Sequence, residues 1–375
     1  MRYSLITLAF TAINANAAVA VAPDGAKIQP EFTTCEYLEC GHYVSSKFYM
    51  QERYLSGGAV RGETFFANPS TERTYKTAFK PNKILSIYNH TTGQFYRPGE
   101  DYIETSSGFA IPDGSKIKFA PEGFVESISP DDQKNYGVRL TTEYQGYQYS
   151  VDYLTAEKFK TESYGSLGNF SKKLGSQPVS ITFFGDSITD GANATGSDAP
   201  PHQPGYAGLI AARLSELYPM LIKSRNNSVG GWSAINATAS VEYRVNDRPS
   251  DLVILAFGMN DGGGYSPKEY RKHLKYVIDA IRAKQPDTAI LLVSPTRANP
   301  ASIIQKPEYI DGYIPELAAL AKEYKSVATV NMTAVWDRLL LNKNYYDITG
   351  NGLNHPNDFG HRIIAEVVLN AILEP

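Results

Sequence analysis

The sequence predicts a chain of two parts, a β-rich domain followed by an α/β domain with a parallel sheet flanked by helices. Its 375 residues suggest about two domains. Residues 21–160 hold short alternating segments between Gly, Pro and Ser turns, which is typical of a β-sandwich or jelly-roll. From residue 179 to 375, apolar strand-like runs alternate with helical patterns, which favours a parallel sheet.

The N-terminus resembles a secretory signal peptide over residues 1–20. Arg2 supplies a positive charge, residues 5–12 form a short apolar core, and two small-x-small cleavage patterns follow at 15–17 and 18–20. No later run is long enough to span a bilayer. We therefore expect an exported protein, secreted or periplasmic, without a membrane span.

Cysteine content and charge restrict the possible partners. Cys35 and Cys40 are the only cysteines, and they either close a small disulfide loop or remain two buried thiols. Only His42 stands near them, which is too few ligands for a metal site. A net charge of -3 gives no reason to expect nucleic acid or an anionic membrane as partner.

The β-rich domain is expected to contain a hairpin. Residues 83–88 alternate between apolar and polar, and a turn cluster at 89–93 leads into 94–96. Further short strands are expected at 101–105, 116–119 and 147–153. The Gly-rich and Lys-rich composition of residues 161–178 marks a linker.

The α/β domain alternates strands and helices. Residues 205–218 carry leucine and isoleucine at helical spacing, and Ser266 and Pro267 are a cap and first residue for a helix over 267–284. The remaining expected elements are strands at 179–184, 251–257, 289–293 and 327–331, and helices at 314–324 and 359–373.

The first of these strands stops abruptly at Gly185-Asp186-Ser187. Gly185 permits a sharp turn, which would leave Ser187 at the carboxyl end of the strand, where open α/β sheets bind ligands. By itself, this pattern also fits a turn serine that caps a helix.

Three further blocks follow in order, at 226–231, 258–261 and 355–360. Together with the Gly-Asp-Ser turn they resemble the SGNH, or GDSL-type, hydrolase superfamily, named for its serine, glycine, asparagine and histidine. The resemblance covers residues 178–375. The resemblance implies a flavodoxin-like parallel sheet flanked by helices. The overall plan of the chain is similar to that of two-domain carbohydrate esterases.

The resemblance also assigns roles to particular residues. Ser187 would be the nucleophile and His355 the base that activates it. The backbone N–H groups of Ser187 and Gly231 and the side-chain amide of Asn260 would bind the oxyanion. Gly231 is preferred over Gly230 because it lies five residues after Asn226.

One position departs from the superfamily pattern. An acid usually stands three residues before the histidine, and here that residue is glycine. Asn351, Asp347 or a backbone carbonyl could orient the His355 ring instead. His361 fits the D-x-x-H pattern literally, but the Pro-Asn-x-x-Gly context that follows His355 favours His355 as the base.

The expected function is that of a secreted serine esterase that needs no cofactor or metal and removes O-acetyl groups from polysaccharides or oligosaccharides. Trp232, His202 and Gln203 are the candidate substrate-binding residues, because they lie in loops at strand ends. The alternatives are a lipase or thioesterase acting on short acyl chains and an inactive glycan-binding protein. The oligomeric state is not predicted.

Overall fold

The computed structural model describes residues 20–21, 27–28, 54–68, 73–122, 124, 142–196, 198–219 and 221–373. The expected signal peptide lies outside the described residues except for Ala20, and Cys35 and Cys40 lie outside them too. Two short strands, β1 (Ala20–Val21) and β2 (Lys27–Ile28), pair antiparallel. Across the described ranges, no helix is both long and apolar enough to cross a membrane.

The C-terminal half is built on a six-stranded sheet. Its strands are β10 (Ser163–Gly165), β11 (Val179–Gly185), β12 (Ile222–Asn226), β13 (Leu252–Ala256), β14 (Ala289–Val293) and β15 (Val327–Val330). They lie in the order β10-β15-β14-β13-β11-β12. Strands β11 to β15 run parallel, whereas edge strand β10 is antiparallel to β15. The sheet is therefore mixed rather than purely parallel, because part of the expected linker joins it.

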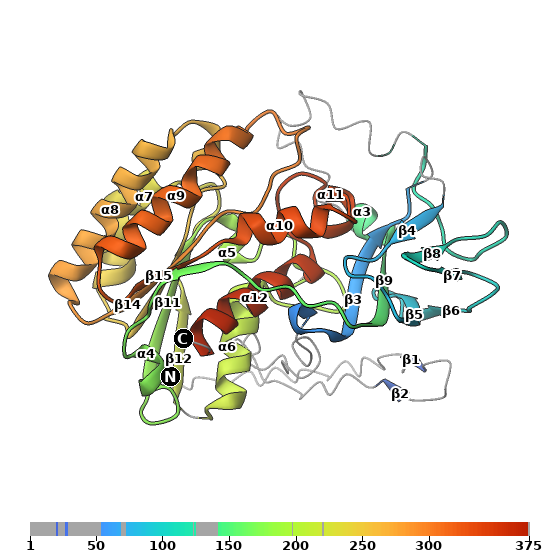
Figure 1. Cartoon of the computed structure of the whole chain (residues 1–375), viewed down its shortest axis with the longest axis horizontal. Coiled ribbons are helices and arrows are strands. Elements are labelled where there is room, and N and C mark those ends of the chain that lie inside the picture. Colours follow the sequence, from blue (N-terminus) through green and yellow to red (C-terminus); the bar gives the residue numbers. More distant parts are fainter. Residues whose placement is uncertain are drawn as a thin grey trace, which may run out of the picture.

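Helices cover both faces of this sheet. The long ones are α6 (Tyr206–Leu217), α7 (Ala234–Val241), α8 (Pro267–Lys284), α9 (Pro307–Glu323), α10 (Met332–Leu340) and α12 (Asp358–Leu373). Figure 1 shows α7, α8 and α9 on one face and α6 and α12 on the other. Successive strand residues serve opposite faces, so Phe183 packs with α6 and α12 while Phe184 packs with α7 and α8. This double coverage explains the continuous apolar runs in the sequence.

Short helical segments connect these elements. They are α3 (Thr142–Gly146), α4 (Phe170–Lys173), α5 (Ser187–Asp190), α11 (Tyr345–Ile348), the 3₁₀ turns η2 (Tyr54–Ser56) and η4 (Asp261–Gly263), and the π-helix η3 (Glu242–Asn246). The segment α11 stands just before the last motif block, and α5 begins at the first.

Besides the β1–β2 pair, the described residues of the N-terminal part form two antiparallel sheets. One holds β3 (Gly58–Phe66), β9 (Gln148–Thr155), β5 (Lys83–Asn89) and β6 (Gln94–Tyr96), and the other holds β4 (Thr74–Lys76), β8 (Gly108–Ala110) and β7 (Ile103–Thr105). The two sheets pack through aromatic rings, with Phe65 at 4.9 Å from Tyr75 and 4.7 Å from Phe109 between ring centroids. The expected hairpin of β5 and β6 is present.

Two expected elements differ in the structure. Residues 116–119 form no strand, because Lys116 donates its N–H to Asp101 and Lys118 donates its N–H to the Tyr149 hydroxyl. Helix α9 begins at Pro307 rather than at 314 and continues through Pro315. Burial of the Ile310 and Tyr313 side chains within it outweighs the local cost of a proline inside a helix.

The N-terminal sheets and the α/β domain share a buried ion pair. Glu63 of β3 lies 3.0 Å from the Lys343 ammonium, and both side chains are almost fully buried. Glu63 also accepts hydrogen bonds from the Tyr153 hydroxyl at 2.6 Å and the Ala78 N–H at 2.9 Å. Burial opposes the charge of Lys343, but the carboxylates of Glu63 and Asp347 outweigh it and raise the pKa of Lys343.

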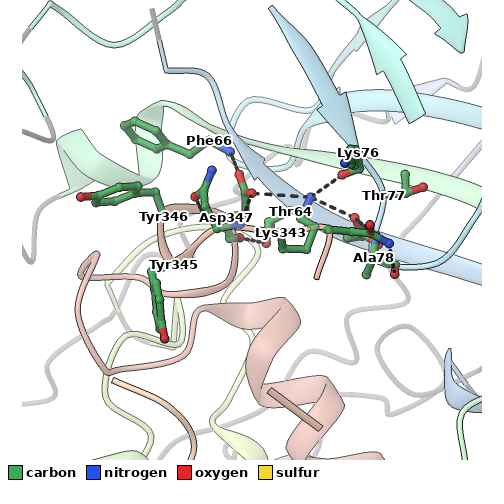
Figure 2. A network of polar contacts seen from close by, with 12 residues as sticks. Thr64, Phe66, Lys76, Thr77, Ala78, Lys343, Tyr345, Tyr346 and Asp347 are labelled. Atoms are coloured by element: carbon green, nitrogen blue, oxygen red, sulfur yellow. Dashed lines mark hydrogen bonds and ion pairs between the residues drawn. The ribbon is translucent and has the colours of Figure 1, made fainter. Parts of the chain in front are cut away.

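The same interface holds the segment that follows Lys343, as Figure 2 shows around Asp347. Asp347 accepts the Phe66 N–H at 2.8 Å, and its carbonyl accepts the Thr64 hydroxyl at 2.5 Å. Gln148 of β9 donates to the Thr349 carbonyl at 2.6 Å. Strands β3 and β9 therefore anchor residues 343–349, which lead into the last motif block.

Candidate active site

Ser187 is presented by a tight turn at the carboxyl end of β11. Gly185 is the last residue of this strand, and a Cβ there would lie 2.5 Å from the Ala256 carbonyl, so a larger residue does not fit. Asp186 caps α5 by accepting the Ile188 N–H at 3.0 Å. The turn therefore leaves Ser187 as the first residue of α5, above the edge of the sheet.

His355 reaches Ser187 from a loop between α11 and α12. Its Nε2 lies 2.9 Å from Ser187 Oγ, although the two residues are 168 positions apart. The loop is closed by a bridge between Thr349 and Pro356 and by the Gly350 N–H, which donates to the His355 carbonyl at 2.9 Å. The structure thus brings together the two residues with the principal expected roles.

The partner of the second ring nitrogen is Asn193. His355 Nδ1 lies 2.8 Å from Asn193 Oδ1, and Asn193 Nδ2 donates to the Gly350 carbonyl at 3.3 Å. Because that carbonyl can only accept, the amide carbonyl of Asn193 must face the ring. Nδ1 then carries the proton, and Nε2 is free to accept the proton of Ser187.

The expected orienting residues are therefore wrong. Asn351 is buried, and its Oδ1 accepts the backbone N–H groups of Leu353, Asn354 and His355 at 2.9 to 3.1 Å, which shapes the loop but does not contact the ring. The carboxylate of Asp347 accepts the N–H groups of Phe66 and Asn344 at the domain interface instead. Sequence reasoning missed Asn193 because this residue lies close to the nucleophile in the chain and outside all four blocks.

Helix α12 fixes the loop that carries Asn193. Asp358 accepts the Thr195 N–H and hydroxyl, both at 2.8 Å. His361 lies 3.1 Å from the Ala192 carbonyl through Nε2, and its Nδ1 accepts the Tyr206 N–H at 3.2 Å. The literal D-x-x-H pattern of the sequence therefore holds the orienting loop, and its histidine does not contact Ser187.

Burial keeps the candidate base neutral. It lowers the pKa of His355 from the usual 6.5 to about 4, because desolvation disfavours the imidazolium. The pKa of His361 is likewise lowered to about 4, mainly by burial. Near neutral pH, both rings are therefore uncharged, and His355 is ready to take a proton.

The expected oxyanion blocks include a turn that lies beside the Ser187 side chain. A Cβ on Gly230 would lie 3.8 Å from Ser187 Cβ, which places the 230–231 turn against the serine, and Gly231 adopts a positive φ of 77°. Asn260 donates one amide hydrogen to the Trp232 carbonyl at 2.9 Å and keeps a second hydrogen. The structure thus places the 230–231 turn beside the serine, and the oxyanion roles of the Ser187 and Gly231 N–H groups and of Asn260 stay a prediction.

Asp261 stabilises the segment that follows this turn. Both of its carboxylate oxygens accept the Ala234 N–H, at 3.0 and 3.1 Å, at the start of α7. Burial raises the pKa of Asp261 to about 7. It therefore acts as a structural partner of the 230–233 segment.

The three candidate substrate residues have different surroundings. Trp232 is half-buried directly after Gly231, and His202 is exposed with Nδ1 at 2.9 Å from the Gly196 carbonyl. Gln203 is fully buried, donates to the Asp358 carbonyl at 2.8 Å and accepts from Arg362 at 2.6 Å. Its expected contact with substrate is wrong, because both ends of its amide are used inside the protein.

The described part of the chain contains no group of three or more His, Cys, Asp and Glu side chains arranged to hold a metal ion.

A family model and several solved structures are similar to parts of this chain. Residues 183–363 match the GDSL-like lipase/acylhydrolase family, and no curated protein matches the sequence. Among solved structures, the chain is similar to Axe2, an acetylxylan esterase from Geobacillus stearothermophilus, with 23% identity over 53% of this chain and 96% of that one and a TM-score of 0.44. It is also similar to CEX, a two-domain esterase active on acetylated mannans, with 18% identity over 58% and 59% of the two chains and a TM-score of 0.46.

The family match spans the nucleophile turn, both oxyanion blocks and the histidine loop. The α/β domain of this chain is therefore an SGNH-type ester hydrolase domain that belongs to the GDSL-like lipase/acylhydrolase family.

Proposed function

We propose that the chain is a serine esterase that removes O-acetyl groups from polysaccharides or oligosaccharides. The observation that supports this most directly is the 2.9 Å contact between Ser187 Oγ and His355 Nε2, with the other ring nitrogen on Asn193. This arrangement combines a hydroxyl nucleophile with a neutral, oriented base, which is what acyl transfer to serine requires.

The proposed reaction has two halves. Ser187 Oγ attacks the acetyl carbonyl while His355 Nε2 takes its proton, and the Ser187 and Gly231 N–H groups and the Asn260 amide stabilise the oxyanion. Collapse of the intermediate breaks the ester bond, and His355 returns the proton to the departing sugar hydroxyl. His355 then deprotonates a water molecule that attacks the acetyl-enzyme, which releases acetate and restores Ser187.

Asn193 is proposed to orient the ring in place of the usual acid. Its carbonyl holds the tautomer in which Nε2 is the acceptor, as the asparagine of Cys-His-Asn proteases does. It supplies no negative charge, so the transient imidazolium depends on the dipole of the amide alone. His355 consequently keeps a low pKa, which a carboxylate in this place would raise.

Two features support a glycan as the carrier of the acetyl group. The half-buried Trp232 ring beside the oxyanion turn suits the apolar face of a sugar. The signal-like residues 1–20 would bring the enzyme out of the cytoplasm, to the secreted or periplasmic side, where structural polysaccharides are found.

The test is acetate release from acetylated xylan, mannan and pectin oligosaccharides, with p-nitrophenyl acetate, longer p-nitrophenyl esters and acyl thioesters beside them. The Ser187→Ala variant is the blank. We expect release of acetate from at least one glycan. Turnover restricted to longer esters or thioesters would instead indicate a lipase or thioesterase, and folded protein that binds glycan without turnover would indicate a binding protein.

The pH dependence tests the role of Asn193. Because the pKa of His355 is lowered to about 4, the neutral base persists as the pH falls. The acid limb of kcat/KM should therefore lie near pH 4 rather than near 6.5. In Asn193→Asp, a carboxylate beside Nδ1 favours the imidazolium, so the limb should move to higher pH.

The matched control is Asn193→Ala, which should lose about 10²- to 10⁴-fold in kcat without an upward shift of the limb. An unchanged limb in Asn193→Asp would show that residue 193 does not contact the ring in the working enzyme.

A further inference from the structure

A cluster of two aromatic rings and one arginine lies beside the oxyanion turn. Its members are Trp232, Tyr243 and Arg244, and the last two belong to the π-helix η3. π-Helical turns are rare and occur often at functional sites. Tyr243 is 60% exposed, which leaves its ring accessible to a ligand.

The cluster is tied to the active site by sequence and by contacts. The Arg244 guanidinium lies 5.3 Å from the centroid of the Trp232 ring and 5.6 Å from that of Tyr243. The Arg244 carbonyl accepts a hydrogen bond from the Asn227 amide. Asn227 and Trp232 flank the 230–231 turn that faces Ser187. A sugar held on this cluster would therefore adjoin a sugar whose acetyl group is at Ser187.

Arg244 is a cation without a carboxylate partner among the described residues. Its Nε is buried and has no hydrogen-bond partner. The nearest acids in sequence are engaged elsewhere, since Glu242 accepts from Asn246 at 3.2 Å and Asp247 lies 3.8 Å from Arg248. Stacking on Trp232 thus positions the guanidinium, and no described residue accepts a hydrogen bond from its Nη groups.

Some arginines elsewhere in the α/β domain have carboxylate partners. Arg297 is held between Asp337 and Asp311, and Arg271 between Glu316 and Glu323. Those ion pairs engage their guanidinium groups. Arg244 lacks such a pair beside a candidate active site, which is the arrangement of an anion-recognition residue.

We propose that Trp232, Tyr243 and Arg244 form a subsite for a sugar bearing an anionic group, either the carboxylate of a uronate or a sulfate ester. The guanidinium pairs with two oxygens of that group, and the aromatic rings contact the apolar faces of the sugar chain. This inference rests on the proposed function and narrows its substrate to acidic acetylated glycans.

The experiment compares kcat and KM for acetylated oligouronate, a sulfated acetylated oligosaccharide, a neutral acetylated xylo-oligosaccharide of equal length and p-nitrophenyl acetate. We expect the wild-type enzyme to favour an anionic glycan, with a preference that weakens as salt is added. Arg244→Gln should raise KM for that glycan by about 10- to 100-fold with kcat unchanged. The kcat and KM values for the neutral glycan and for p-nitrophenyl acetate should change by less than about twofold.

Three further variants separate recognition from folding. Arg244→Lys keeps the charge and should retain part of the preference, whereas Tyr243→Ala should raise KM for both kinds of glycan and leave p-nitrophenyl acetate unaffected. Arg248→Gln, at an exposed arginine nearby, is the matched control and should leave kcat and KM for all four substrates unchanged.

Preference for either the uronate or the sulfated substrate supports the subsite and identifies the anion. Equal activity on anionic and neutral glycans, or an equal effect of Arg244→Gln on all four substrates, would overturn it. If the wild-type enzyme hydrolyses p-nitrophenyl acetate and neutral glycan only, this inference fails while the proposed function stands. If the wild-type enzyme hydrolyses none of the four acetyl esters, both this inference and the proposed function are wrong.

Discussion

Replacing either Ser187 or His355 by alanine is expected to lower kcat for acetyl esters by about 10⁶-fold, and the double variant should lose no more than either single variant. Ser187 Oγ and His355 Nε2 are 2.9 Å apart and act on one proton. Once either is removed, the other has no step to assist, so the losses do not add. The residual rate would come from the oxyanion donors.

Steady-state kinetics of the two single variants and the double variant with p-nitrophenyl acetate measures these losses in kcat. KM should change little. The matched control is His361→Ala, which removes a buried ring that contacts the Ala192 carbonyl and not Ser187. It should keep far more turnover than His355→Ala while lowering the melting temperature. The reverse ranking, or multiplicative losses in the double variant, would refute the assignment of the base.

Replacing Lys343 by methionine is expected to lower the free energy of unfolding by about 3–5 kcal/mol. The substitution leaves the Glu63 carboxylate buried without its cation, 3.0 Å from where the ammonium stood. It also removes a hydrogen bond from Lys343 to the Lys76 carbonyl at 3.2 Å. Because residues 343–349 lead to the His355 loop, kcat should fall as well.

Guanidinium unfolding of the full chain measures this loss. The double variant Glu63→Gln/Lys343→Met removes both charges and should recover part of the stability, since no unpaired charge remains. The exposed pair of Arg97 and Glu100 supplies the control, and Glu100→Gln should cost less than about 1 kcal/mol. Equal costs for Lys343→Met and Glu100→Gln would show that the buried pair does not stabilise the interface.

Local patterns in the sequence predict much of the fold. The strands at 289–293 and 94–96 and the helix at 267–284 have the expected limits. The helix is well defined because Ser266 accepts the Glu269 N–H, an interaction between near neighbours. Strand β10 and residues 116–119 were wrongly expected as linker and strand, because their partners are distant in sequence.

Local sequence patterns are enough to predict the candidate groups of the site, since Ser187, Gly231, Asn260 and His355 stand in blocks at turns and strand ends. The contacts between distant residues are visible only in the folded chain, where Asn193 lies against the imidazole, Asp358 and His361 hold its loop, and Glu63 of the N-terminal domain pairs with Lys343. These contacts join residues up to 280 positions apart. No periodicity or motif encodes such a pair, because its energy arises only when folding removes both partners from water.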